Sequence, residues 1–323
     1  MSTARVFFAP PTEADRFLPE SPQAVAVSGR PALAWVNIQT AEQSRSGAVH
    51  LRFWDTSEHR VLKQPARPAF ISLTDRPGVV LVGREKELGL LNLETGGWTH
   101  LAAIPDDNPR TIINDGAVVP GGSAVVFGTK DIQFRDPIAA LYLLTVADRR
   151  VTELAGRHVC SNGKVFERDS GGLILYDIDT PRRVVRRYRL DLDRRSVADE
   201  GIAVDLRAVD GFPDGMVDAG DHTVVIAIYN PGRVRDGRAN HYDLGSGQRL
   251  GEWVVPGSPR VTCPLLVEQG GKIQLVLTTA VEGMPDDQRH ECPYAGELFI
   301  ADAGIKEVPP SAAVTLSGDG RPT

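Results

Sequence analysis

Short runs of hydrophobic residues recur along the chain at intervals of about 45 to 50 residues, and each run ends near Gly, Asp, Asn or Pro. The clearest runs cover residues 32–38, 78–82, 124–127, 173–176, 223–229 and 273–278. A second strand follows most of them and ends in a Thr-Gly or Ser-Gly turn, as at residues 90–96 and 241–247, which is typical of a β-hairpin. This interval is the length of one four-stranded blade, so the pattern predicts an all-β propeller.

The ends of the chain fit the same architecture. A radial fold closes its ring when a strand from one terminus completes the blade begun at the other, and residues 5–8 and 296–301 are the expected pair. We therefore predict one propeller domain over residues 1–310 and a flexible tail over residues 311–323, which are mostly small or polar. No Gly-rich segment follows a strand and opens a helix, which argues against a Rossmann domain or a phosphate-binding loop.

Composition narrows the classes of partner. The chain has 323 residues, 41% of them hydrophobic, and a net charge of -6, so it can build a continuous core but lacks the basic field that nucleic acid requires. Three cysteines without close pairing indicate reduced thiols. The N-terminal residues lack a signal-peptide pattern, and no run is long enough to span a membrane. We expect a cytoplasmic protein with a small-molecule substrate, no membrane partner, and a monomeric or weakly oligomeric state.

Four short segments each place an oxygen-bearing side chain beside a turn residue: Glu20-Ser21-Pro22, Asn114-Asp115-Gly116, Ser161-Asn162-Gly163 and Pro213-Asp214-Gly215-Met216. Each alone is an ordinary turn, because Asn, Asp and Gly tolerate left-handed backbone. The segments lie about one or two repeat lengths apart, so a radial fold would aim all four at one axis. Together they predict a site for a hard divalent cation.

In this order, and with Phe127-Gly128-Thr129 after the second segment, these motifs resemble those of the family of senescence marker protein 30 (regucalcin), gluconolactonases and luciferin-regenerating enzymes. The resemblance runs from about Glu20 to Ile300. It implies a six-bladed β-propeller with a divalent cation in an axial pocket. By the family's pattern Glu20, Asn162 and Asp214 are metal ligands, and Asn114 touches either the metal or the substrate. Oxygen ligands favour Ca²⁺, and they leave Mg²⁺, Mn²⁺ and Zn²⁺ open.

Such a cation can polarise a carbonyl and lower the pKa of bound water, which predicts a metal-dependent hydrolase that opens a lactone or a related cyclic ester. Asp214 is the candidate base. A bond to the metal would weaken Asp214 as a base, so direct attack by water on the cation remains an alternative.

Three residues point to an altered substrate pocket. Members acting on sugar lactones often carry Arg two residues before the Asn of the Asn-Asp-Gly motif, whereas this chain has Ile112 there. Lys130 and Gln133 follow Gly128-Thr129, where an acidic residue is common. With Asn114, these three are the predicted substrate-binding residues. Arg110 could replace the missing Arg only if its loop is rearranged, and Lys130 with Asp131 could equally form a solvated pair at a strand end.

The sequence is also compatible with other functions. The same ligands suit a non-catalytic metal-binding regulatory protein or a hydrolase of organophosphate esters. A scaffold for protein partners is also conceivable, although 6% aromatic residues give it little support. The trio His158, Cys160 and Asn162 resembles a zinc site only weakly, and no Gly-x-Ser-x-Gly elbow favours a serine hydrolase.

Overall fold

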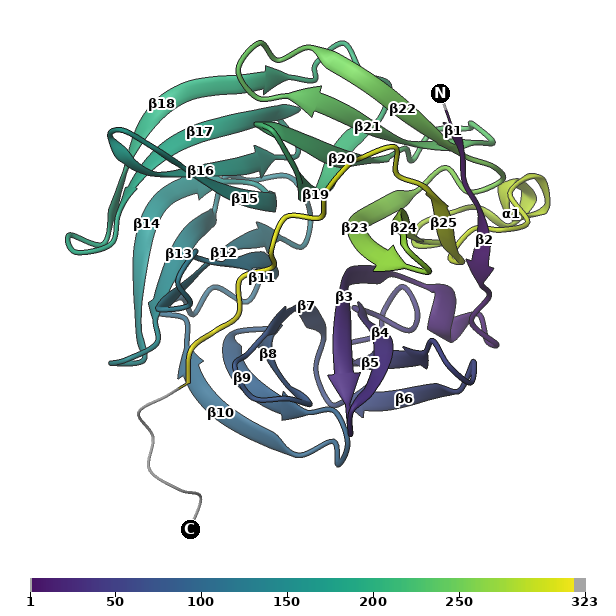
Figure 1. The fold of residues 1–323 in the computed structure, drawn as a ribbon, viewed down its shortest axis with the longest axis horizontal. Helices are drawn as coiled ribbons and strands as arrows, with labels where there is room; N and C mark the ends of the chain where they lie inside the picture. The colour runs from purple at the N-terminus through teal and green to yellow at the C-terminus, as the bar shows by residue number, and fades with distance from the viewer. Residues whose placement is uncertain (1, 317–323) are drawn as a thin grey trace.

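The strands form six sheets arranged radially around one axis (Figure 1). The computed structural model describes residues 2–316. Blades 1 and 2 comprise β3 (Pro19–Val27), β4 (Arg30–Asn37), β5 (Gly47–Phe53), β6 (His59–Gln64), β7 (Pro68–Leu73), β8 (Val79–Arg84), β9 (Glu87–Asn92) and β10 (Trp98–Ala103). Blades 3 and 4 comprise β11 (Thr111–Val118), β12 (Ala124–Asp131), β13 (Ala139–Thr145), β14 (Arg150–His158), β15 (Ser161–Asp169), β16 (Gly172–Asp179), β17 (Val184–Asp191) and β18 (Ser196–Asp205).

Blades 5 and 6 combine strands from both ends of the chain. They comprise β19 (Phe212–Gly220), β20 (Thr223–Tyr229), β21 (Gly237–Asp243), β22 (Arg249–Val255), β23 (Val261–Gln269), β24 (Lys272–Thr279) and β25 (Leu298–Asp302), to which β1 (Ser2–Thr3) and β2 (Arg5–Phe8) are added. Two short helices, η1 (Ala14–Arg16) and α1 (Asp286–Glu291), lie in connections. No helix in the described residues has the length and hydrophobicity needed to cross a membrane.

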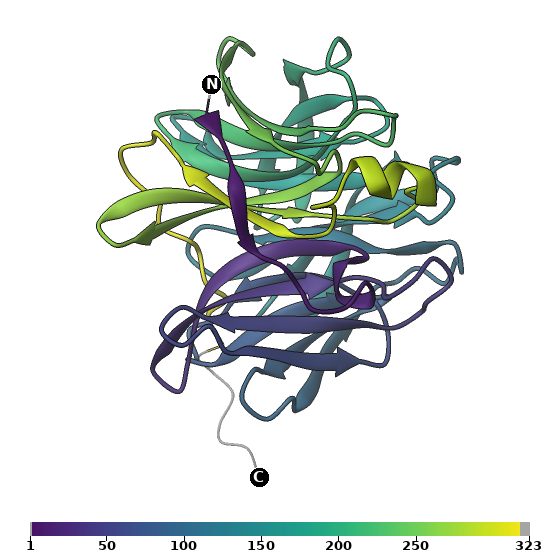
Figure 2. The ribbon, with the colours of Figure 1, turned by 90° about the vertical axis from the view of Figure 1, so that its right-hand side faces the viewer.

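The N-terminal chain closes the ring. Strand β2 pairs antiparallel with β25, with Arg5 opposite Ile300, which confirms the predicted closure of blade 6. Strand β1 also extends blade 5 by pairing parallel with β22. The sequence does not predict this contact, because β1 consists of only two polar residues, Ser2 and Thr3. Figure 2 shows this chain running from blade 5 past blade 6 into blade 1. The N-terminal residues thus tie three blades together.

Hydrophobic side chains fill the spaces between neighbouring blades. One buried cluster joins Val36 of blade 1 to Val82 of blade 2, and another joins Phe70 of blade 2 to Phe127 of blade 3. A single blade cannot cover both of its apolar faces, so each blade is stable only against its neighbours. The outermost strands alternate between exposed and covered residues, as β18 does. This closed packing holds the innermost strands rigidly around the axis.

The C-terminal segment crosses one end of the axis (Figure 1). Its Val314 is fully buried, forms a parallel bridge with Thr74, and donates its N–H to the Leu73 carbonyl at 2.8 Å. Val314 and Leu316 belong to the cluster between blades 2 and 3. The predicted boundary at residue 310 therefore lies too early, because these apolar side chains complete a core. Residues 317–323 of the predicted tail lie outside the described residues.

Candidate axial site

A cavity of about 460 Å³ lies at the axis, and the four predicted metal-site residues line it. Glu20 lies on β3, Asn114 on β11, Asn162 on β15 and Asp214 on β19, which are the innermost strands of blades 1, 3, 4 and 5. A second cavity, of about 230 Å³, is lined by residues further along these strands and by residues 308–312. The structure thus brings all four predicted residues together, at the end of the axis away from the C-terminal segment.

A β-bulge accompanies each of the four residues. The strand register shifts between Glu20 and Gln23, between Ile113 and Asp115, between Asn162 and Lys164, and between Pro213 and Met216. A bulge leaves a residue out of the ladder and re-aims its side chain. The turn-forming Pro and Gly residues of the motifs supply this irregularity, which explains why oxygen-bearing residues and turn residues are adjacent in the sequence.

The amide side chains are held by specific hydrogen bonds. Asn114 donates its Nδ2 to the carbonyl of Ser161 at 3.1 Å, which leaves its Oδ1 without a donor among the described residues. Asn162 donates its Nδ2 to Asp214 and to the Thr180 hydroxyl, the latter at 3.3 Å. Asn114 therefore offers a free acceptor to the cavity, and Asn162 links the blade 4 side of the site to the Asp214 carboxylate.

Like charges are concentrated at the axis. Burial and the charges of Asp214 and Asp115 raise the pKa of Glu20 well above its usual value. Burial also raises the pKa of Asp214, although the Lys130 ammonium and the hydrogen bond from Asn162 oppose the shift. A divalent cation would relieve this desolvation and repulsion, and two carboxylates with two amides form an oxygen donor set of the kind that Ca²⁺ and Mg²⁺ bind. The residues present therefore fit a hard dication.

Thiol and imidazole ligands play no part in this donor set. The described residues contain no group of three or more His, Cys, Asp or Glu arranged to hold a metal ion. Cys160 lines the cavity, but His158 is directed toward the buried Asp177, with 3.9 Å between Nε2 and Oδ2. The weak zinc hypothesis for the His158, Cys160 and Asn162 trio gains no support from this arrangement.

Lys130 lines the cavity and is 8% exposed. Its neighbour Asp131 is fully buried and binds Arg110, with 3.2 Å between Oδ1 and Nε. The two residues therefore do not form a solvated pair at the end of the strand, which was the alternative prediction for Lys130 and Asp131. Because successive side chains of a strand point to opposite faces, Lys130 and Asp131 face different surroundings.

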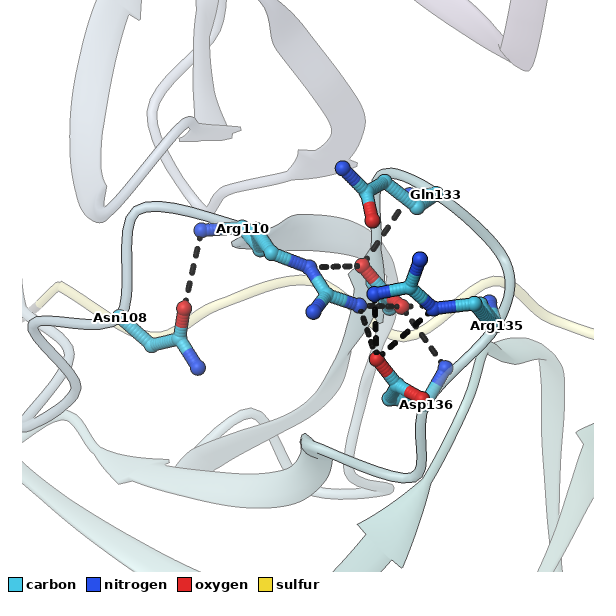
Figure 3. Close-up of polar contacts among 6 residues, drawn as sticks. Asn108, Arg110, Gln133, Arg135 and Asp136 are labelled. Carbon is cyan, nitrogen blue, oxygen red and sulfur yellow. Dashed lines mark hydrogen bonds and ion pairs between the residues drawn. The ribbon is translucent and has the colours of Figure 1, made fainter.

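The remaining predicted substrate residues lie outside the cavity wall. Ile112 is buried opposite Lys130 in the ladder between β11 and β12, and Gln133 is exposed in the loop after β12. Arg110 does not replace the missing family arginine, because Asp131 and Asp136 both bind its guanidinium (Figure 3). Asn114 and Lys130 are thus the predicted substrate residues that reach the cavity.

The cavity wall also contains residues that the sequence motifs do not predict. Ile132 and Phe134, which are 38% and 51% exposed, lie in the same loop as Gln133 and form part of the rim. Tyr229 lies at the end of a predicted strand and donates its hydroxyl to the backbone carbonyl of Glu282 at 3.1 Å. Strand alternation does not place Ile132 and Phe134, because β12 ends at Asp131 and Phe134 has a left-handed backbone with φ of 48°.

Close packing of blades 4 and 5 positions Asp214. A Cβ at Gly163 would lie 2.6 Å from the backbone nitrogen of Met216 and 2.8 Å from the carbonyl oxygen of Asp214. We expect Gly163→Ala to destabilise the protein by about 1–3 kcal/mol, because backbone must move, and to weaken divalent-cation binding. Urea denaturation and calorimetric titration measure the two effects.

Gly251→Ala is the control variant, because a Cβ at Gly251 would make only an ordinary van der Waals contact, at 3.7 Å from the His241 side chain. Equal effects of the two substitutions on stability and cation binding would contradict the packing role of Gly163.

The family model described as the SMP-30/gluconolactonase/LRE-like region matches residues 18–281. The chain belongs to this family. An L-arabinolactonase from Azospirillum brasilense is 30% identical over 84% of this chain and 84% of its own length, and a regucalcin from Xenopus laevis is 26% identical over 80% and 85%.

Solved structures agree with the family's propeller fold. A calcium-binding regucalcin from Agrobacterium tumefaciens superimposes with a TM-score of 0.77 at 21% identity, covering 95% of this chain and 97% of that one. A luciferin-regenerating enzyme gives a TM-score of 0.76 at 20% identity, covering 98% and 100%. These likenesses confirm the six-bladed β-propeller predicted from the motifs.

Proposed function

We propose that this protein is a divalent-cation-dependent hydrolase that opens a lactone or a related cyclic ester in the axial cavity. The observation that carries the proposal is the convergence of Glu20, Asp214, Asn114 and Asn162 on one cavity. Membership of a family that includes an L-arabinolactonase supports the reaction class. A cavity of about 460 Å³ also has the size of a small-molecule site.

Glu20, Asp214 and Asn162 would hold the cation, with Asn114 beside it. A bound divalent cation supplies Lewis-acid polarisation of the ester carbonyl. Ca²⁺ is the cation we expect, since hard oxygen donors suit it and a regucalcin with this fold is described as calcium-binding.

The protein's own groups orient the substrate and move the proton. In the reaction, water adds its oxygen to the carbonyl carbon, the ring C–O bond breaks, and the ring oxygen gains a proton, giving a hydroxy acid. Asp214, partly desolvated and bound by Asn162, is the group proposed to accept a proton from the attacking water. The free Oδ1 of Asn114 can accept a hydrogen bond from a substrate hydroxyl.

The test is proton release from a panel of lactones by chelated protein, with Ca²⁺, Mg²⁺, Mn²⁺ and Zn²⁺ returned separately. We expect no turnover after chelation and recovery with one or more of these ions. A phosphotriester panel run in parallel separates lactone opening from organophosphate hydrolysis. Tight cation binding with no hydrolysis of either panel would contradict the proposal and favour a non-catalytic regulatory protein.

A further inference from the structure

The ammonium of Lys130 is a buried cation without a hydrogen-bonding partner. The side chain lies in the cavity wall and is 8% exposed, yet no described residue forms a hydrogen bond or ion pair with its Nζ. Its aromatic neighbour is the ring of Phe134, whose centroid lies 5.4 Å from Nζ. The Lys130 charge favours the ionised forms of Glu20 and Asp214, but its N–H groups have no acceptor among the described residues, so the ammonium can donate to an acceptor in the cavity.

The cavity wall is divided by charge. Its carboxylates belong to Glu20 and Glu42 of blade 1, Asp214 of blade 5 and Glu282 of blade 6, which are neighbours in the ring. Lys130, the cation among the described wall residues, comes from blade 3 on the opposite side of the ring from blade 6. The two halves of the wall therefore favour different parts of a bound molecule.

The proposed cation sharpens this division. It would neutralise Glu20 and Asp214, which leaves Glu42 and Glu282 as the remaining carboxylates of the wall, on blades 1 and 6. The ammonium then remains as a positive charge beside the apolar side chains of Ile132 and Phe134. Low local polarity strengthens a charge-assisted hydrogen bond, so an anion would be bound most favourably on this side.

We infer that the substrate is a lactone carrying a carboxylate, which the Lys130 ammonium binds while the ester group lies at the carboxylate side of the cavity. This inference rests on the proposed function. It makes Lys130 a specificity-determining residue that distinguishes acidic lactones from neutral ones. A different role, in which the ammonium acts on the ester carbonyl itself, would help acidic and neutral lactones equally.

The test compares 5-oxotetrahydrofuran-2-carboxylate with its carboxamide, two lactones of nearly the same shape that differ in charge. The wild-type protein should prefer the acid by at least about tenfold in kcat/KM, the scale of one charge-assisted hydrogen bond. In Lys130→Met, which keeps an unbranched side chain of similar length, the ratio should fall to about one. Lys63→Met, at an exposed position on β6, should retain the wild-type ratio.

Both proteins are assayed at saturating divalent cation, because removing a nearby positive charge also tightens cation binding. Equal rates on acid and amide in the wild type, or a ratio unchanged by Lys130→Met, would overturn the inference. If neither of these two lactones is opened with any cation, the lactone panel described above tests the proposed function separately, and calorimetric binding of the acid still tests the subsite. Binding that Lys130→Met removes would then support the carboxylate subsite, and absence of binding would overturn it.

Discussion

Asp214→Asn is expected to remove divalent-cation binding and to lower kcat/KM for lactone opening by at least about a hundredfold. The substitution keeps the size of the side chain but removes one of the two carboxylates at the proposed cation site. The propeller should stay folded, because the lost charge is one that burial and neighbouring carboxylates disfavour. We therefore expect the melting temperature of the cation-free variant to equal or exceed that of the wild type.

Asp218→Asn is the matched control for this variant. Asp218 lies on the same strand, β19, but lines the second cavity, where its carboxylate accepts the N–H of Gly220 at 2.9 Å. Calorimetric titration with Ca²⁺ and a pH-stat assay on the same preparations compare the two variants. Metal-dependent activity that survives in Asp214→Asn would remove this residue from the site.

Asp131→Asn is expected to give the largest loss of stability, about 2–4 kcal/mol by urea denaturation. The buried Asp131 carboxylate accepts hydrogen bonds from Arg110 and from the backbone N–H groups of Gln133, Arg135 and Asp136. These bonds fix the loop that presents Ile132 and Phe134 to the cavity, so the KM for the lactone should also rise. A variant that matches the wild type in both properties would contradict this role.

The same carboxylate makes stability depend on pH. Burial alone would raise the pKa of Asp131, but the hydrogen bonds from Arg110 and the loop backbone outweigh it and hold the pKa well below its usual range. A depressed folded-state pKa contributes stability that is fully present above the unfolded value of about 3.9 and is lost as the pH falls below it. Asp131→Asn should therefore lose less stability than the wild type between about pH 4 and pH 2.

Asp136→Asn is the control for both measurements. Its side chain is 39% exposed, and Arg110 retains Asp131 when the second carboxylate is removed. Exposed ion pairs contribute little, so the loss should stay below about 1 kcal/mol. A comparable loss of stability in both variants would show that the loop depends on the total negative charge around Arg110 and not on the buried carboxylate.

Local signals account for what the sequence predicted correctly. Neighbouring residues alone determine the spacing of the blades, the hairpin turns and the four turn motifs. The structure contains the corresponding strands, and it brings Glu20, Asn114, Asn162 and Asp214 together at one cavity. The pairing of β2 with β25 also followed from the need to close the ring. These features depend on the chain's own periodicity and on general rules for propellers.

Long-range contacts account for the rest. Whether Lys130 faces the cavity or solvent depends on the register of β11 and β12. Arg110 is held away from the cavity by Asp131 at the end of β12 and by Asp136 in the loop that follows, both more than 20 positions along the chain. The packing of Val314 depends on a gap between blades 2 and 3 that no local pattern reveals. A single sequence shows which residues have reactive or ligand-binding side chains. Their contacts with residues of other blades are visible only in the folded structure.

The most direct test of the proposed cation site is the position of Mn²⁺ by anomalous diffraction in crystals soaked with that ion, using protein that Mn²⁺ is shown to bind in solution. We expect one strong anomalous peak in the axial cavity, within coordination distance of the carboxylates of Glu20 and Asp214 and next to Asn162. A Mn²⁺ peak elsewhere in the protein, with none between these two carboxylates, would contradict the proposed site.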